Sequence, residues 1–192
     1  MIFGSPQPIH WDRLARAVEF YRHMGFRYVE VPWAVTPSVT KLTLPAGIES
    51  FHVGERDLIG SAEQGLLQLI KAGFLPPGKY VACSPCFRNE RQLDDLHQHR
   101  FMKVELIDTS SDQDLRELLS FARHFFSMEG AEVVETLQTD SRNPAWPQID
   151  LEWGGIELGS YGTRTIDGLT WTYGTGVSEP RFSHVTELVA RS

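Results

Sequence analysis

Apolar residues recur at helical spacing in three stretches of the chain, residues 11–24, 61–72 and 110–130. The first stretch is followed directly by Gly25 and the second by Gly73. A glycine at this position accepts the left-handed backbone conformation that often ends a helix. Periodicity of this kind indicates an amphipathic helix with one buried face. The three stretches are therefore predicted to be helices.

The third of these stretches also carries a start signal. Ser110 and Gln113 have the spacing of a capping box, in which two side chains satisfy the free amide groups at the beginning of a helix. Gly130 closes the stretch. The sequence therefore predicts a helix that begins close to Ser110 and ends before Gly130.

Other segments have the alternation of β-strands. The segment 26–33, "FRYVEVPW", reads as a strand interrupted by Pro32, and 80–87, "YVACSPCF", as a second strand. The stretch 148–176 alternates and turns like antiparallel strands. Because helices sit among hairpins without a β-α-β rhythm, the predicted fold class is α+β, with an antiparallel sheet flanked by helices. The length fits one domain over residues 1–192.

The segment 86–106, "CFRNERQLDDLHQHRFMKVEL", contains more chemistry than a hairpin needs. A polar tip at residues 91–98 separates Arg88 and Glu90 from Phe101 and Glu105. Residues two or four apart on a strand face the same side. If the register brings both pairs to one face, the sheet carries a cation, two carboxylates and an aromatic ring there. Such a set suits a nucleotide.

Bulk composition narrows the function classes. The formal net charge is −7 at pH 7 and the pI is about 5.5. This balance argues against a surface that holds a long nucleic acid by its phosphates. No apolar run approaches the roughly 20 residues of a membrane span, and the N-terminus lacks the regions of a signal peptide. We expect a cytoplasmic protein that does not associate with membranes.

The chain has two cysteines, Cys83 and Cys86, in "CSPC". A C-x-x-C pair occurs in zinc sites and redox sites, but no second pair or close His cluster completes a tetrahedral set. Alternation places the two on opposite faces of a strand or at a bend around Pro85. A structural role is favoured, and a redox or metal role is the alternative.

Five segments, in order, resemble the catalytic domain of the class II aminoacyl-tRNA synthetases. "CFRNE" followed by "HRFMKVEL" looks like motif 2, and "GTGVSEPR" at 174–181 looks like motif 3 with the spacing of the seryl type. "GFRYVEVP" is similar to motif 1, the region that forms the dimer interface in the family. "GSAEQGLL" resembles the loop that holds the amino group of the substrate, and "IDLEWGGIELGSYG" resembles the strand region before motif 3. The seryl-tRNA synthetases and the amino acid:carrier protein ligases are the most similar types.

The resemblance implies a ligase that binds ATP and activates an amino acid as an adenylate. By similarity Arg88 grips the α-phosphate and the substrate carboxylate, a task suited to a planar fork of donors. Glu90 accepts a hydrogen bond from the adenine amino group, and Phe101 stacks on the ring. Arg181 covers the other adenine face and reaches the γ-phosphate. His99 meets the polyphosphate; the alternative for His99 is a surface turn residue.

The same resemblance implies an amino-acid site and a metal site. Glu63 and Glu105 are the acceptors for the ammonium group, and Ser61 replaces the usual threonine and keeps the hydroxyl. Glu157 and Ser160 match the positions that hold Mg²⁺, which prefers hard oxygen ligands. A solvated strand carboxylate is the alternative for Glu157. ATP is the expected co-substrate and a homodimer the expected assembly.

The chain departs from the family in ways that bear on the acceptor. We expect no anticodon-binding domain and no tRNA-binding arm, and Asp94 and Asp95 stand where a tRNA acceptor stem is normally approached. Only eleven residues follow Arg181, so a short motif 3 helix is expected. The resulting hypothesis is transfer to a carrier protein or a small amine, without strong tRNA binding. A tRNA synthetase or tRNA-modifying enzyme that acts on the acceptor end, and a regulatory paralogue that binds a nucleotide without turnover, are the alternatives.

Overall fold

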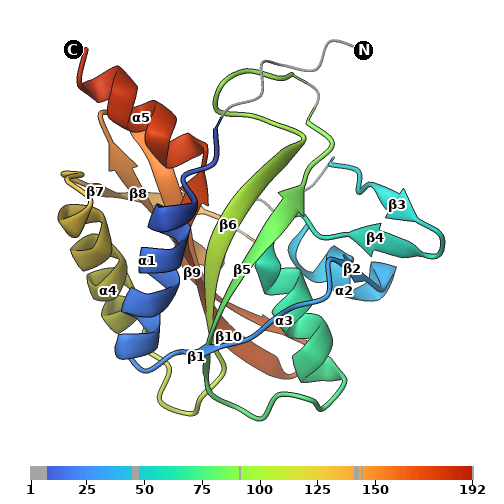
Figure 1. Ribbon diagram of the computed structural model, residues 1–192. Helices are drawn as coiled ribbons and strands as arrows, with labels where there is room; N and C mark the ends of the chain where they lie inside the picture. Colours follow the sequence, from blue (N-terminus) through green and yellow to red (C-terminus); the bar gives the residue numbers. More distant parts are fainter. Residues whose placement is uncertain (1–7, 45–47, 91, 141–142, 144, 192) are drawn as a thin grey trace.

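The computed structural model describes residues 8–44, 48–90, 92–140, 143 and 145–191. Ten strands in this part form two sheets, and five helices pack around them (Figure 1). The helices are α1 (Trp11–His23), α2 (Pro37–Thr43), α3 (Ala62–Lys71), α4 (Leu115–Met128) and α5 (Arg181–Val189). The strands are β1 (Arg27–Tyr28), β2 (Ala34–Val35), β3 (His52–Val53), β4 (Arg56–Leu58), β5 (Lys79–Phe87), β6 (Arg100–Asp108), β7 (Val134–Thr139), β8 (Pro147–Trp153), β9 (Ile156–Ile166) and β10 (Leu169–Glu179).

The larger sheet has seven strands in the order β1-β5-β6-β10-β9-β8-β7. Adjacent strands in this sheet are antiparallel, except that β1 pairs in parallel with β5. The smaller sheet has the order β2-β4-β3. The predicted α+β class, with an antiparallel sheet flanked by helices, is confirmed.

The two faces of the large sheet are covered differently, as Figure 1 shows. One face packs against α1, α4 and α5 through a buried apolar cluster that includes Tyr21, Leu106 and Phe125. A second cluster, which includes Leu66 and Trp171, lies between α2, α3, the small sheet and one part of the opposite face. The remaining part of that opposite face carries polar side chains, and the cavities described below lie over it.

The predicted helix boundaries hold at α1 and α3. Gly25 and Gly73 follow these helices with φ of +92° and +77°, a conformation that glycine adopts without steric cost. Ser61 is the N-cap of α3, and its side chain accepts a hydrogen bond from the backbone N–H of Glu63. Helix α5 is nine residues long, as expected for a short motif 3 helix.

The predicted start of the third helix is wrong. Helix α4 begins at Leu115, and Asp114 is its N-cap because its carboxylate accepts the N–H of Arg116 at 2.8 Å. Ser110 instead donates its hydroxyl to Asp108 Oδ1 at 2.6 Å and forms a turn at the end of β6. Asp108 Oδ1 also accepts the backbone N–H of Ser110 at 2.8 Å, and a local bond between a side chain and the backbone competes with helix capping. The predicted end before Gly130 is confirmed.

Two strand predictions also need correction. The 26–33 segment is in strand conformation only at Arg27–Tyr28, because β5 is its one hydrogen-bonding neighbour there. Strand β5 ends at Phe87, so Arg88 and Glu90 follow the strand and do not alternate along it. The predicted polar tip begins at Arg91, which lies outside the described residues. Residues 92–98 are irregular, as expected for a tip.

Cys83 and Cys86 both lie within β5 on opposite faces, one half-buried and one buried, and both thiols are free. Burial raises the pKa of Cys83 to about 11 and that of Cys86 to about 12, so both remain protonated at neutral pH. In the described part of the chain, no group of three or more His, Cys, Asp or Glu could hold a metal ion. A buried, protonated thiol fits the favoured structural role.

None of the helices of the described residues has the length and apolar character to cross a membrane.

Candidate functional site: two joined cavities over one face of the sheet

Strand β6 presents three site residues in succession on one face of the sheet. Phe101, Lys103 and Glu105 alternate with residues that point to the helices, and Cys86 and Ala82 of β5 stand opposite Phe101 and Glu105. The predicted common face of Phe101 and Glu105 is therefore confirmed. Lys103 between them was not singled out from the sequence, although its parity would have placed it there.

Two neighbouring cavities lie over this face. The smaller cavity, of about 50 Å³, is lined by residues of the 95–98 segment, by β6 and by the end of β10. The larger cavity, of about 290 Å³, extends toward the start of α3 and toward β8 and β9. Residues that line both cavities are Arg88, Glu90, Lys103 and Glu157. The two cavities therefore adjoin each other at these residues.

Arg88 stands at the junction. Its Nε donates to the carbonyl of Gly60 at 3.2 Å, and its guanidinium carbon lies 5.2 Å from the centre of the Phe101 ring. The backbone N–H of Arg88 donates to His99, which continues the β5–β6 ladder by one step. The Gly60 carbonyl and the Phe101 ring thus hold the Arg88 side chain at the boundary between the two cavities.

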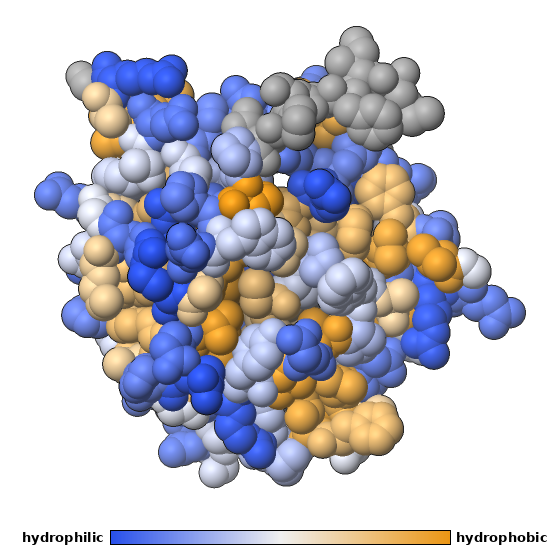
Figure 2. All heavy atoms as spheres, in the orientation of Figure 1, coloured by the Kyte–Doolittle hydropathy of each residue, from blue (hydrophilic) through white to orange (hydrophobic). Residues whose placement is uncertain are grey.

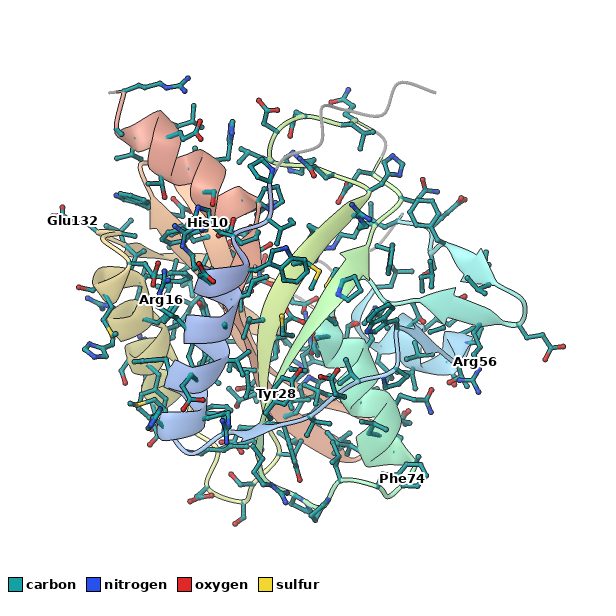
Figure 3. All side chains as sticks on the ribbon, viewed as in Figure 1. His10, Arg16, Tyr28, Arg56, Phe74 and Glu132 are labelled. Carbon is teal, nitrogen blue, oxygen red and sulfur yellow. The ribbon has the colours of Figure 1, made fainter. Side chains whose placement is uncertain are left out.

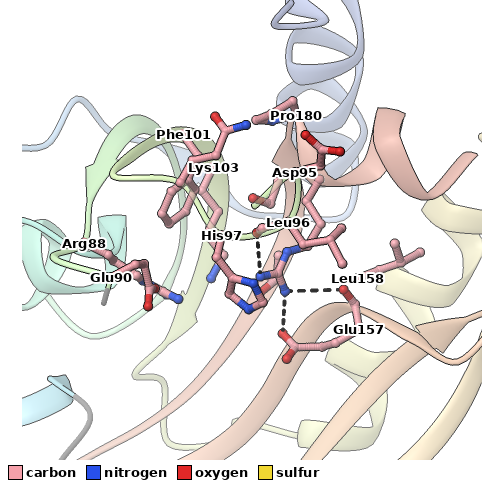
Figure 4. A pocket seen from close by; sticks show the side chains of 14 residues that line it. Arg88, Glu90, Asp95, Leu96, His97, Phe101, Lys103, Glu157, Leu158 and Pro180 are labelled. Carbon is pink, nitrogen blue, oxygen red and sulfur yellow. Dashed lines mark hydrogen bonds and ion pairs between the residues drawn. The ribbon is translucent and has the colours of Figure 1, made fainter. Parts of the chain in front are cut away.

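The smaller cavity brings together Glu90, Phe101 and Arg181, three of the residues predicted for the nucleotide. Figure 4 labels Glu90 and Phe101 in this cavity. Arg181 donates to the backbone carbonyl of Leu96 at 3.2 Å and to that of Glu157 at 3.4 Å, and its Nη1 lies 3.6 Å from the Glu157 carboxylate. Arg181 begins α5, so the end of β10 fixes its position. The Arg181 guanidinium therefore bonds both to the 95–98 segment and to β9.

His99 is not among the residues that line either cavity. Its ring packs against Phe51, with the ring centres 5.5 Å apart. His97 lines the smaller cavity in its place, and its ring nitrogen is 2.9 Å from Asp94. The predicted contact of His99 with a polyphosphate stays a prediction that this geometry does not support.

The larger cavity contains the three residues predicted for the amino acid, Ser61, Glu63 and Glu105. The N–H of Glu63 donates both to Ser61 Oγ at 3.1 Å and to Glu105 Oε2 at 3.0 Å, so the start of α3 is fastened to β6. Glu105 also forms an ion pair with Lys103. The carboxylate of Glu63 accepts hydrogen bonds from Arg164 Nη1 at 2.8 and 3.0 Å.

Arg164 was missed by the sequence analysis. It lies on β9, is 101 residues from Glu63, and donates its Nε to Asp140 at 2.9 Å. Burial lowers the pKa of this guanidinium, but the charges of Glu63 and Asp140 outweigh burial and raise the pKa overall. A lone arginine in an alternating strand carries no signal of such a partner, because the pairing depends on tertiary structure.

Glu157 and Ser160, the residues predicted for Mg²⁺, lie together on β9, with the Ser160 hydroxyl donating to Glu157 Oε1 at 3.1 Å. Asp150 stands opposite Ser160 on β8, and burial raises the pKa of its carboxyl group. Two or three oxygen ligands suit a Mg²⁺ that takes its other ligands from phosphates and water. They do not make a complete protein cage.

The sequence is similar to aminoacyl-tRNA synthetases of class II. The family model "tRNA synthetases class II core domain (F)" matches residues 66–155. The serine–tRNA ligase of Staphylothermus marinus is 30% identical over 160 residues, which cover 72% of this chain and 35% of that protein. The serine–tRNA ligase of Thermotoga maritima is 29% identical over 184 residues, which cover 87% of this chain and 41% of that protein.

Solved structures share the fold. The cytoplasmic serine–tRNA ligase of Naegleria fowleri in complex with AMP superimposes with a TM-score of 0.71 at 19% identity, covering 88% of this chain and 46% of that chain. A pyrrolysyl tRNA synthetase structure from Desulfitobacterium hafniense gives a TM-score of 0.72 at 18% identity, covering 94% of this chain and 70% of that chain.

These matches identify the chain as a class II aminoacyl-tRNA synthetase-like domain. The five motif resemblances therefore pointed to the correct domain type. The chain spans about 35% to 41% of the length of the curated relatives it matches.

Proposed function

We propose that this protein activates an amino acid with ATP and transfers the aminoacyl group to a carrier protein or a small molecule. The observation that carries the proposal is the position of Arg88 at the junction of the two cavities. Phe101 lies on one side of it, where a purine would be held, and Ser61 and Glu105 lie on the other, while Glu90 lines both cavities. A planar guanidinium at that point can hold a phosphate and a carboxylate together.

In the proposed first step an oxygen of the substrate carboxylate attacks the α-phosphorus of ATP, and the bond to pyrophosphate breaks. The carboxylate is already ionised at neutral pH, so the site needs no general base for this step. Its task is to orient the reactants and to stabilise the charge that develops on phosphate oxygens. Arg88 serves the reacting phosphate, and Arg181 serves the distal phosphate when its guanidinium leaves Leu96.

Bound Mg²⁺ would neutralise phosphate charge, and Glu157 and Ser160 are the residues that would hold it. In the second step a thiol or an amine attacks the acyl carbon, the bond to the phosphate oxygen breaks, and AMP leaves. The nucleophile loses its proton to solvent.

A screen of ATP/pyrophosphate exchange over the amino acids tests activation without knowledge of the acceptor. We expect ATP and Mg²⁺ to bind and at least one amino acid to support exchange. The support for this expectation is that Arg88 lines both cavities. Measurable ATP binding without exchange for any amino acid would favour the non-catalytic, nucleotide-binding alternative.

Binding of total tRNA at physiological salt is expected to be weak and salt-sensitive. Affinity for a polyanion comes largely from Lys and Arg at its phosphates, and this chain has 18 basic residues against 25 acidic ones. The carboxylates of Asp94 and Asp95 are exposed, and Asp95 lines the smaller cavity. Filter binding and aminoacylation assays measure this. Sub-micromolar binding with a stable ester-linked product would instead support the tRNA synthetase alternative.

The protein is expected to be a homodimer. Strand β1 ends the large sheet at one edge, where an unpaired edge favours further pairing. Tyr28 of this strand and the nearby Trp33 are exposed by 39% and 55%. Figure 2 shows apolar side chains along the middle of the face on which Figure 3 labels Tyr28. Sedimentation equilibrium at micromolar concentration measures the mass, and a monomeric mass would contradict the expectation.

A further inference from the structure

The carbonyl that holds Arg88 belongs to a short loop. Strand β4 ends at Leu58 and α3 begins at Ala62, so residues 59–61 connect the two elements. The carbonyl of Gly60 in this loop accepts the Nε of Arg88 at 3.2 Å. A Cβ atom added to Gly60 would lie 3.6 Å from Arg88 Cγ, so the loop backbone also packs against the aliphatic part of the arginine. The position of Gly60 therefore determines where the Arg88 guanidinium lies.

Gln64, in the first turn of α3, holds this loop with both its side chain and its backbone. Its Oε1 accepts the backbone N–H of Gly60 at 2.8 Å, and its own N–H donates to the carbonyl of Ser61 at 3.1 Å. Its Nε2 donates to the carbonyl of Thr40 in α2 at 3.5 Å. Gln64 is 2% exposed, so these bonds are formed away from water.

The peptide group between Ile59 and Gly60 is bonded at both ends. Its carbonyl accepts the N–H of Phe87 at 2.8 Å, and its N–H donates to Gln64. Both bonds matter because glycine has a wide range of backbone angles and does not fix its own carbonyl. Without Gln64 the N–H of Gly60 would be buried without a partner, which costs free energy that a shift of the loop relieves. Such a shift turns the Gly60 carbonyl away from Arg88.

Helix capping alone does not account for the Gln64 contact. Gln64 stands three residues after the N-cap Ser61, where the glutamine of a capping box bonds to the N–H of the N-cap residue itself. The side chain instead bonds to Gly60, one residue earlier, whose carbonyl meets Arg88. Gln64 also lines the larger cavity, but both polar atoms of its amide have partners within the chain. The amide is therefore engaged by the protein and is not left for a ligand.

We propose that Gln64 is a positioning residue for amino-acid activation, and that it keeps Arg88 in its reactive place through Gly60. The inference rests on the proposed function, because it concerns the arginine assigned to the reacting phosphate. Gln64 touches neither the phosphate nor the substrate carboxylate in this role. Its contribution to the rate therefore depends on the presence of Arg88.

Replacing Gln64 with methionine removes the acceptor and keeps the length of the side chain. We expect kcat for pyrophosphate exchange to fall by about 10²-fold, the effect of a misplacement of roughly 1 Å at a reacting group. KM for ATP and for the amino acid should stay close to the wild-type values, because the interaction that is lost acts in the transition state. A raised KM for the amino acid with unchanged kcat would show that Gln64 binds the substrate directly, and would overturn the inference.

Gln64→Glu is the conservative variant. A carboxylate keeps an acceptor oxygen for the N–H of Gly60, and a glutamate suits the first turn of a helix. Most of the rate lost in Gln64→Met should therefore be present in Gln64→Glu. An equal loss in the two variants would count against the bond to Gly60 as the cause.

A double-mutant cycle with Arg88→Ala separates positioning from a general structural role. Gln64→Met should have little further effect on the rate when Arg88 is already alanine, because residues that act as one unit are not additive. A further loss of about 10²-fold in the Arg88→Ala background would show that the two residues act independently, and the inference would be wrong.

Gln68, one turn further along α3, provides a matched control. Its Oε1 accepts the backbone N–H of Thr36 at 3.0 Å, so it also fastens the helix to a neighbouring segment, but its partner there is outside the 59–61 loop. Gln68→Met should leave kcat unchanged. Equal losses in Gln64→Met and Gln68→Met would show that loosening of α3 is the cause, which contradicts the inference.

Two further outcomes are separated by design. If Gln64→Met does not fold, as judged by circular dichroism, Gln64→Asn keeps an amide but withdraws its oxygen from Gly60 by one methylene, and the same non-additive loss is expected. If the wild-type protein binds ATP but supports exchange with no amino acid, the proposed function fails, and this inference fails with it. Exchange by the wild-type protein with an unchanged rate in folded Gln64→Met contradicts the inference alone.

Discussion

Replacing Arg88 with alanine is expected to lower the rate of amino-acid activation by about 10²- to 10³-fold without unfolding the protein. Removing one preorganised donor to developing charge has an effect of this size. Arg88 meets the requirement for preorganisation because the Gly60 carbonyl and the Phe101 ring hold its guanidinium at the junction of the cavities. Single-turnover pyrophosphate release measures the rate, and circular dichroism reports the fold.

Two variants control this result. Arg116→Ala removes an arginine whose side chain is 71% exposed on α4, on the opposite side of the sheet, and activity should be unchanged. Arg88→Lys keeps the positive charge but loses the planar fork, so a partial loss is expected. If Arg88→Ala retains the wild-type rate, the assignment of the reacting centre to this arginine is wrong.

Replacing Arg13 with methionine is expected to reduce the free energy of unfolding by about 3 to 5 kcal/mol. Arg13 of α1 forms an ion pair with Glu179, which is 0% exposed at the end of β10, and also donates to Ser183 at 2.8 Å. Its guanidinium also lies 4.5 Å from the centre of the Phe182 ring. Loss of one partner leaves Glu179 buried and charged, which accounts for the size of the effect. Urea unfolding measures it.

Arg16, one turn further along α1, offers a matched control. Its side chain is 55% exposed and it contacts Glu129, which Arg13 also contacts. Arg16→Met should cost no more than about 1 kcal/mol, because Arg16 is exposed and Glu129 keeps Arg13 as its partner. The double variant Arg13→Met with Glu179→Gln should regain part of the lost stability. Equal effects of the two single variants would show that burial of Glu179 is not the cause.

The sequence predicted those features that depend on local pattern. Helices α1 and α3 follow from apolar spacing and from Gly25 and Gly73, whose backbone conformation ends a helix. The shared face of Phe101 and Glu105 follows from strand alternation alone. The start of α4 was misplaced because Ser110 found a nearer partner in Asp108, and a capping pattern does not show which partner is available.

Contacts between side chains far apart in the chain could not be predicted from the sequence. Glu63 was predicted to face the substrate, and only the fold places Arg164 and Trp171 on its carboxylate. The strand prediction for 26–33 overestimated β1, because a strand needs a neighbour and β5 pairs with only two of these residues. Arg88, Glu90 and Arg181, which the motif resemblance singled out, line one cavity, and their roles remain predictions.

The contact between Arg181 and the Leu96 carbonyl has a consequence for nucleotide affinity. A cavity of about 50 Å³ has room for water molecules but not for a purine. If ATP binds here as proposed, it needs a conformation in which the 95–98 segment has moved and Arg181 has exchanged Leu96 for a phosphate. The observed dissociation constant is then the intrinsic constant divided by the fraction of molecules in that conformation. Any acceptor that holds the segment away from Arg181 would tighten ATP binding by raising this fraction, without touching the nucleotide.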